Sequence, residues 1–169
     1  MAVKLVRIAA VITLVVASLS AQTNVGAITA KLGEVHVVRR DTEGERQLEG
    51  AKGVPVLKGD LIRTERGGRM RINLLDGSII SAGSQTEFRL LRHDPRKGDT
   101  TIVLTAGRMH AVVARGVKFV VRTPVASVEI QGDCGIDEAT VSCTTGQAII
   151  SKPDGTSQTC AAGATVVLR

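Results

Sequence analysis

Short segments in which apolar and polar residues alternate recur about every ten residues along the chain. The clearest is Met70 to Leu74, which lies between two turn dipeptides, Gly59-Asp60 and Asp76-Gly77. A period of two is the pattern of a strand with one buried face, and Asp-Gly is a strong hairpin signal. Because no stretch after residue 21 keeps a helical period, the sequence predicts an all-β domain.

Turn residues divide this domain into many short strands, which fits either an antiparallel β-sandwich or a short, solenoid-like β-roll. Val54 to Leu57 contains a proline and is expected at a sheet edge. Arg92 to Asp99 combines charge with proline and glycine, which predicts an exposed loop. The expected strands are 32–40, 46–48, 54–57, 61–64, 70–74, 79–82, 87–91, 100–105, 108–114, 117–122, 125–130, 135–143, 147–151 and 165–168.

The first 21 residues have the features of a secretory signal peptide. Lys4 and Arg7 precede an apolar run, Ile8 to Leu19, and Ser20-Ala21 supplies small residues for cleavage. This run is shorter than the roughly 18 to 20 residues that cross a bilayer, so the alternative, a stable membrane anchor, is not expected. We therefore expect a periplasmic or secreted protein. The expected organisation is a signal peptide at 1–21, a linker at 22–32 and one all-β domain at 33–169.

Three cysteines, Cys134, Cys143 and Cys160, lie in the last quarter of the chain, and an exported protein can form disulfides. If Glu138-Ala139 is the two-residue loop of a hairpin, a regular antiparallel register places Cys134 opposite Cys143. We predict a disulfide between these two, with Cys160 either free or exchanging into the pair. The spacing of the cysteines does not suggest a zinc site or a catalytic thiol.

The net charge and the aromatic content of the chain indicate which kinds of molecule it can bind. The formal net charge of +6 falls by the two basic residues of the signal segment, which holds no acid, so the mature chain is mildly basic. Its acids and bases are interspersed, as on a solvated surface. Phe88 and Phe119 are the only aromatic residues, so few rings are available to stack on bases or sugars. Nucleic-acid binding is therefore not expected.

Asp60 and Asp76 are the candidate carboxylates for a general acid/base pair, as a hydrolase would need. The favoured interpretation is structural, because an aspartate at the start of a turn accepts hydrogen bonds from nearby backbone amides. Gly59 and Gly77 then supply the positive φ that such turns require.

Other reactive groups do not form a recognisable set. His36, His93 and His110 are far apart in sequence and lack the spacing of metal ligands. The sequence also lacks a nucleophile elbow and a phosphate-binding loop. We therefore predict no catalytic, cofactor or metal site, and expect that the protein is not an enzyme.

Arginines offer a second kind of chemistry. Arg63, Arg71 and Arg122 could bind an anionic ligand, although strand arginines more often lie along a sheet with their heads in water. A short internal repeat also contains arginine: Gly68-Arg69-Met70 recurs 39 residues later as Gly107-Arg108-Met109, and each copy precedes an apolar strand. Two similar sheet layers or successive coils would explain this repeat, and coincidence is the alternative.

Taken in order, the turns and strands resemble the FecR-type domain. The resemblance covers about Gly33 to Gly163 and includes a Thr123-Pro124 strand start. It implies a fold in which Gly59, Asp60, Asp76, Gly77, Thr123 and Pro124 are turn residues. The matching motifs are Gly33-Glu34-Val35, a compressed element at 48–50, Gly59 to Thr64, Asp76-Gly77-Ser78, Ala106 to Met109 and Arg122 to Val128.

Two departures from the family pattern bear on function. Where relatives carry Arg-Gly-Thr, Gly132 is followed here by Asp133 to Ile136, so a disulfide replaces aromatic packing in our interpretation. The iron-transport regulators of this family also have a cytoplasmic anti-sigma segment and a membrane helix, whereas we expect a stand-alone exported domain here. The resemblance implies a module that binds a protein or a cell-envelope polymer. The alternative is a periplasmic sensory module that signals to a membrane partner.

Overall fold

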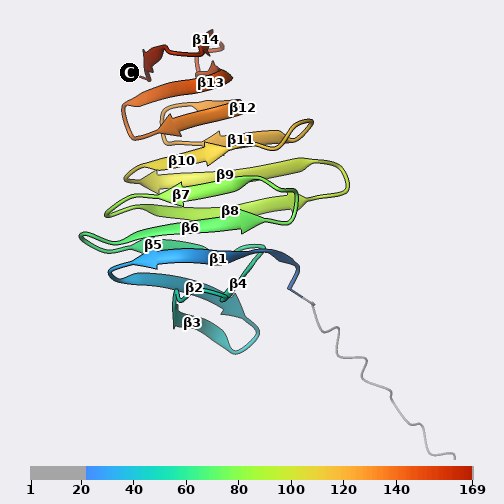
Figure 1. Cartoon of the computed structure of the whole chain (residues 1–169), viewed down its shortest axis with the longest axis vertical. Coiled ribbons are helices and arrows are strands. Elements are labelled where there is room, and N and C mark those ends of the chain that lie inside the picture. Colours follow the sequence, from blue (N-terminus) through green and yellow to red (C-terminus); the bar gives the residue numbers. More distant parts are fainter. Residues whose placement is uncertain (1–21, 169) are drawn as a thin grey trace, which may run out of the picture.

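The computed structural model describes residues 22–168, which form strands and turns (Figure 1). This part of the chain contains no helix that is long and apolar enough to cross a membrane. The predicted signal peptide at 1–21 lies outside the described residues. The prediction of an all-β domain is confirmed.

Fifteen strands within residues 22–168 belong to one sheet. They are β1 (Asn24–Leu32), β2 (Val35–Asp41), β3 (Gly44–Glu49), β4 (Pro55–Leu57), β5 (Leu61–Thr64), β6 (Arg69–Leu74), β7 (Ile79–Ala82), β8 (Glu87–Asp94), β9 (Asp99–Ala106), β10 (Met109–Val112), β11 (Lys118–Arg122), β12 (Ser127–Ile136), β13 (Thr140–Ser151), β14 (Ser157–Ala161) and β15 (Thr165–Val167).

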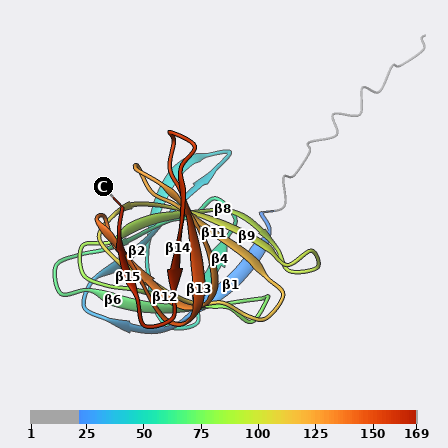
Figure 2. The same cartoon turned by 90° about the horizontal axis from the view of Figure 1, so that it is seen from above.

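The sheet is an open path that turns back on itself at β12. One arm runs β3-β2-β5-β8-β9-β11 and the other runs β10-β7-β6-β1-β4, while β13 pairs with β12, β14 and β15. Strands of the two arms alternate along the long axis in Figure 1, and Figure 2 shows them curving around a shared interior. The sequence left a sandwich and a roll open, and the structure is a single curled, open sheet.

One hydrophobic cluster fills the inside of this curl. Ile62 and Phe88 from the first arm and Ile72 and Ile80 from the second are all fully buried in it. In β6, buried and exposed residues alternate along the whole strand, as the sequence predicts. The inner faces therefore hold the fold together by apolar burial, and the outer faces remain free for contacts.

Two opposed glycines allow β12 and β13 to bend from one arm into the other. Gly132 and Gly146 face each other in the register and have φ values of 106° and 76°. A Cβ on Gly146 would lie 1.9 Å from the carbonyl oxygen of Gln131, so a side chain does not fit there. β12 thus pairs with β11 before the bend and with β10 after it.

The predicted linker at 22–32 is wrong, because residues 24–32 form β1. This strand pairs with β4 and β6, and Val25 and Ile28 lie in the core. Two features hide its alternation. Small residues fill the segment, and a register shift between Ile28 and Ala30 changes which side chains face inward.

The predicted loop from Arg92 to Asp99 is shorter than expected. β8 continues to Asp94, β9 begins at Asp99, and His93 is buried. A register shift between Leu90 and Arg92 moves the following residues of β8 onto the opposite face, which turns His93 inward.

Candidate interaction groove

Asp60 lies in a turn between β4 and β5, where it forms a buried ion pair. Arg39 donates from Nε to Oδ1 at 3.0 Å and from Nη2 to Oδ2 at 2.8 Å, and the Leu57 amide also donates to Oδ2 at 2.8 Å. The Asp60 side chain is 1% exposed and that of Arg39 is 15% exposed. The hydrogen bond with Asp60 raises the pKa of Arg39. Asp60 therefore anchors a turn, which Gly59 enables with a φ of 92°.

Asp76 lies in the turn between β6 and β7 and is also buried, with a side-chain exposure of 1%. Its Oδ1 accepts the Ser78 amide at 2.8 Å, and its Oδ2 accepts the Thr100 hydroxyl at 2.9 Å. Gly77 has a φ of 87°, as the turn requires. Asp76 therefore links its own turn to the start of β9.

His93 completes this buried polar cluster. Its Nδ1 lies 2.9 Å from the Thr100 hydroxyl oxygen and 3.6 Å from Asp76 Oδ2. Since the Thr100 hydroxyl donates its hydrogen bond to Asp76, its oxygen accepts a hydrogen bond from Nδ1–H, and Nε2 carries no proton in the neutral imidazole. Burial lowers the pKa of His93, against the opposing effect of Asp76 and Asp94. Nε2 has no hydrogen-bond partner among the described residues.

The structure does not bring the two aspartates together in a shared site. Each carboxylate is satisfied by its own partners, and no hydrogen bond or ion pair joins Asp60 to Asp76 in the described part of the chain. The Thr123-Pro124 pair forms the turn between β11 and β12. There, Thr123 Oγ1 accepts the Ala126 amide at 3.1 Å, and Pro124 is exposed.

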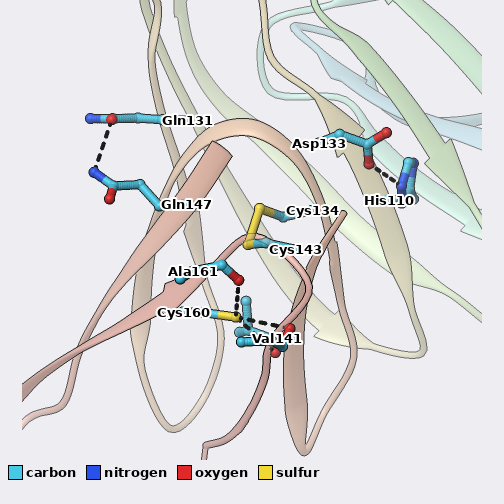
Figure 3. The surroundings of a disulfide bond; sticks show 10 residues. His110, Gln131, Asp133, Cys134, Val141, Cys143, Gln147, Cys160 and Ala161 are labelled. Carbon is cyan, nitrogen blue, oxygen red and sulfur yellow. Dashed lines mark hydrogen bonds and ion pairs between the residues drawn. A yellow bond between two sulfur atoms is a disulfide. The ribbon is translucent and has the colours of Figure 1, made fainter. Parts of the chain in front are cut away.

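The structure contains the predicted Cys134–Cys143 disulfide, which joins facing residues of β12 and β13 (Figure 3). Cys160 is free and buried, and its thiol donates to the carbonyl oxygens of Val141 at 3.4 Å and Ala164 at 3.3 Å. The disulfide links β12, where the two arms meet, to its neighbour β13 in the same sheet.

A shallow groove lies on the outer face of the second arm and crosses β6, β7 and β10. Its volume is about 380 Å³, and a second hollow of about 400 Å³ adjoins it around Arg108 and Asp137. The groove is lined by Arg69, Ser81, Ala82, Gly83, Arg108, Met109, His110, Gly135, Ile136, Asp137, Thr140 and Ser142. Small residues from β7, β12 and β13 leave this part of the face open.

Two arginines border the groove without a partner of their own. Arg69 and Arg108 are exposed, and neither guanidinium makes a hydrogen bond or ion pair with another residue of 22–168. They are the equivalent positions of the internal repeat. The methionine after each one pairs with the same residue, Ala82 of β7, from opposite sides. The repeat therefore places the two arginines on either side of β7, Arg69 at the start of β6 and Arg108 directly before β10.

Two acids near the groove are already engaged. His110 Nε2 lies 2.5 Å from Asp133 Oδ1, an ion pair when the histidine is protonated (Figure 3). Burial alone would raise the pKa of Asp137, but hydrogen bonds from Ala139 and Thr140 lower it below the ordinary value, with a smaller contribution from Arg108. Asp137 is thus held by its own hairpin and does not form an ion pair with Arg108.

The arginines singled out individually from the sequence have different surroundings. Arg63 is paired with Glu87 at 2.6 Å, and Arg122 lines a separate hollow beside Thr123-Pro124. Arg71 is exposed on β6 next to Arg69. Sequence reasoning did not assign Arg69 and Arg108 to a site, although the repeat that contains them was the signal that could have done so.

Comparisons with known proteins agree with this fold. The family described as FecR protein matches residues 60–149, just over half of the chain. Two solved structures of a putative anti-sigma factor from Parabacteroides distasonis ATCC 8503, at 1.65 and 2.50 Å resolution, share 21% identity with a TM-score of 0.55. The match covers 63% of this chain and 53% of theirs, so it shows a common fold. No curated protein matches. The family match shows that this chain belongs to the FecR family.

Proposed function

We propose that the protein is an exported, non-enzymatic regulatory module that acts by contacting another protein. Membership of the FecR family supports a regulatory role, and so does the shared fold with a structure titled as a putative anti-sigma factor. The chain spans about half of that protein's length, so the proposal concerns this domain only.

The observation that carries the proposal is the contrast between the buried acids and the open groove. Asp60 and Asp76, the candidate pair for hydrolysis, are buried and already hydrogen-bonded. The groove is exposed and carries unpaired charge, as a recognition surface requires. All of its lining residues, Arg69 to Ser142, fall within the segment that matches the family.

A protein partner is favoured over a carbohydrate polymer of the envelope. Sugar-binding surfaces commonly stack sugar rings on aromatic side chains, yet both aromatic residues, Phe88 and Phe119, are fully buried. His110 and Asp137 in the groove are already engaged by other residues of this chain. The polar groups that remain available there are guanidinium groups and hydroxyls, which suit carboxylates and peptide groups.

Cross-linking in the cells of origin tests the proposal. The full chain with a carboxyl-terminal affinity tag would be cross-linked in intact cells, purified under denaturing conditions and analysed by mass spectrometry. We expect one defined protein, recovered from the envelope fraction. Retention of polysaccharide without a protein partner would contradict the proposal, and so would a substrate turnover that Asp60→Asn or Asp76→Asn abolishes in a folded chain.

A further inference from the structure

We propose that the groove bordered by Arg69 and Arg108 is the partner-binding site and that it takes an extended, acidic peptide segment of the partner. This inference rests on the proposed function and deepens it by assigning a place and a chemistry to the contact. None of the turn motifs of the family resemblance assigns a ligand to this face.

The two guanidinium groups are the main attraction for such a segment. Each has planar N–H donors that match a carboxylate in bidentate fashion, and neither is used by a residue of 22–168. By contrast, Arg39 and Arg63 are both committed to acids of this chain. Asp137 and Glu138 also line the adjoining hollow, but their carboxylates already accept backbone amides of this chain. The two guanidinium groups are therefore the charged groups that remain open to a carboxylate of a partner.

Glycine at position 83 shapes the space between the two arginines. A Cβ there would lie 2.8 Å from both Cγ and Nε of Arg108, so the side chain of Arg108 lies against the bare backbone of Gly83. Because β7 separates β6 from β10, the two arginine backbones are about 10 Å apart, which is two strand spacings. Long side chains on such neighbours can reach successive acids of one extended chain.

The outline of the groove favours a chain over a compact ion. The two adjoining hollows share Arg108 and Asp137, so together they cover more of this face than a single ion would occupy. Ser81 and Ser142 line it and offer hydroxyls that can bond to peptide N–H and C=O groups. An extended segment whose acidic side chains contact Arg69 and Arg108 would use both the guanidinium groups and the hydroxyls of the groove.

The test uses the folded full chain labelled with ¹⁵N and a ten-residue peptide of alternating glutamate and serine. Titration should shift the amide signals of Ser81, Gly83 and Gly135, and the peptide with lysine in place of glutamate should leave them unchanged. The double variant Arg69→Gln/Arg108→Gln should weaken binding about tenfold. Higher salt should weaken it too, since both arginines are exposed.

The matched control is Arg96→Gln/Arg115→Gln, which removes the same charge from two exposed turns. We expect this control to bind like the parent chain. Equal loss in both double variants would overturn the proposal, because binding would then depend on net charge alone. Unchanged binding by Arg69→Gln/Arg108→Gln would overturn it as well.

Inorganic polyphosphate tests the identity of the ligand. If polyphosphate shifts the same amide signals and the glutamate peptide does not, the proposed peptide ligand is wrong and the groove binds a phosphate polymer. A cross-linked partner in cells with no effect of the groove variant would leave the proposed function intact and refute this site alone.

Discussion

Asp60 and Asp76 lie inside the molecule, whereas Arg69 and Arg108 lie on its outer face. Both aspartates have side-chain exposures of 1% and are held by several hydrogen bonds, while both arginines are exposed and their guanidinium groups make no hydrogen bond or ion pair with residues 22–168. The difference separates two uses of charge. Buried and satisfied charge fixes the turns of a β-domain, and exposed, unsatisfied charge is available to a partner.

The same contrast sets the expected cost of mutation. Removing one partner of a buried ion pair leaves the other charge buried without a partner, which is strongly destabilising. Removing an exposed, unpaired arginine leaves nothing unsatisfied behind. Stability measurements can therefore test this contrast, because a large loss in the free energy of unfolding marks a structural charge and a small loss marks an exposed charge available to a partner.

Replacing Asp60 by asparagine should have the largest effect. It leaves Arg39 without its carboxylate, and we expect a loss of about 3 kcal/mol in the free energy of unfolding, measured by urea denaturation. As a control, the double variant Arg39→Met/Asp60→Leu should recover much of this loss, since it removes both charges together. A loss below about 0.5 kcal/mol in the free energy of unfolding for Asp60→Asn would show that Asp60 does not stabilise the turn.

Asp76→Asn should cost less, about 2 kcal/mol, because the amide can still accept the Ser78 hydrogen bond while it loses the charged acceptor for Thr100. Urea denaturation again measures the effect. Thr100→Val, which removes the bridging hydroxyl, should destabilise the protein as well. If Asp76→Asn instead left stability unchanged, the polar cluster would not be holding the turn.

His93 should make stability depend on pH. Burial lowers its pKa in the folded protein, so the unfolded chain takes up the proton more readily, and stability falls as the pH drops below about 6.5. For one proton, the slope is at most about 1.4 kcal/mol per pH unit. Urea denaturation between about pH 7 and 5.5, above the ordinary carboxylate range, should show this slope. The variant His93→Gln should flatten it, and an equal slope in the variant would show that another group is responsible.

Arg69→Gln/Arg108→Gln should have the smallest effect on stability, within about 0.5 kcal/mol of the parent chain. Thermal unfolding followed by circular dichroism measures it. A large loss would mean that the arginines support the fold, and the weaker peptide binding expected of this variant would then have a structural cause.

Much of the fold follows from local signals in the sequence. Asp-Gly and Gly-Asp turns and the strict alternation of 70–74 locate strands, because each depends on a few neighbouring residues. The Cys134–Cys143 pair follows for the same reason, since a short hairpin sets the register as far as these two residues, and the register shift comes only beyond them, between Cys134 and Asp133.

The remaining features depend on contacts between distant segments. β1 lacks a clear pattern and gains its place by pairing with β6, and His93 turns inward because of a shift in the register of β8. The groove is a further case: Arg69 and Arg108 become neighbours only because β7 pairs with both β6 and β10. Such long-range pairing leaves little trace in a single sequence beyond the weak repeat.

Site-specific photo-cross-linking in cells tests the central claim most directly. A photoreactive amino acid would replace Ser142, an exposed residue lining the groove, in the parent chain, in Arg69→Gln/Arg108→Gln and in Arg96→Gln/Arg115→Gln. We predict a defined protein adduct in the parent and in the control, and its loss in the groove variant at an unchanged unfolding temperature. Adducts of equal yield in all three chains would contradict the account.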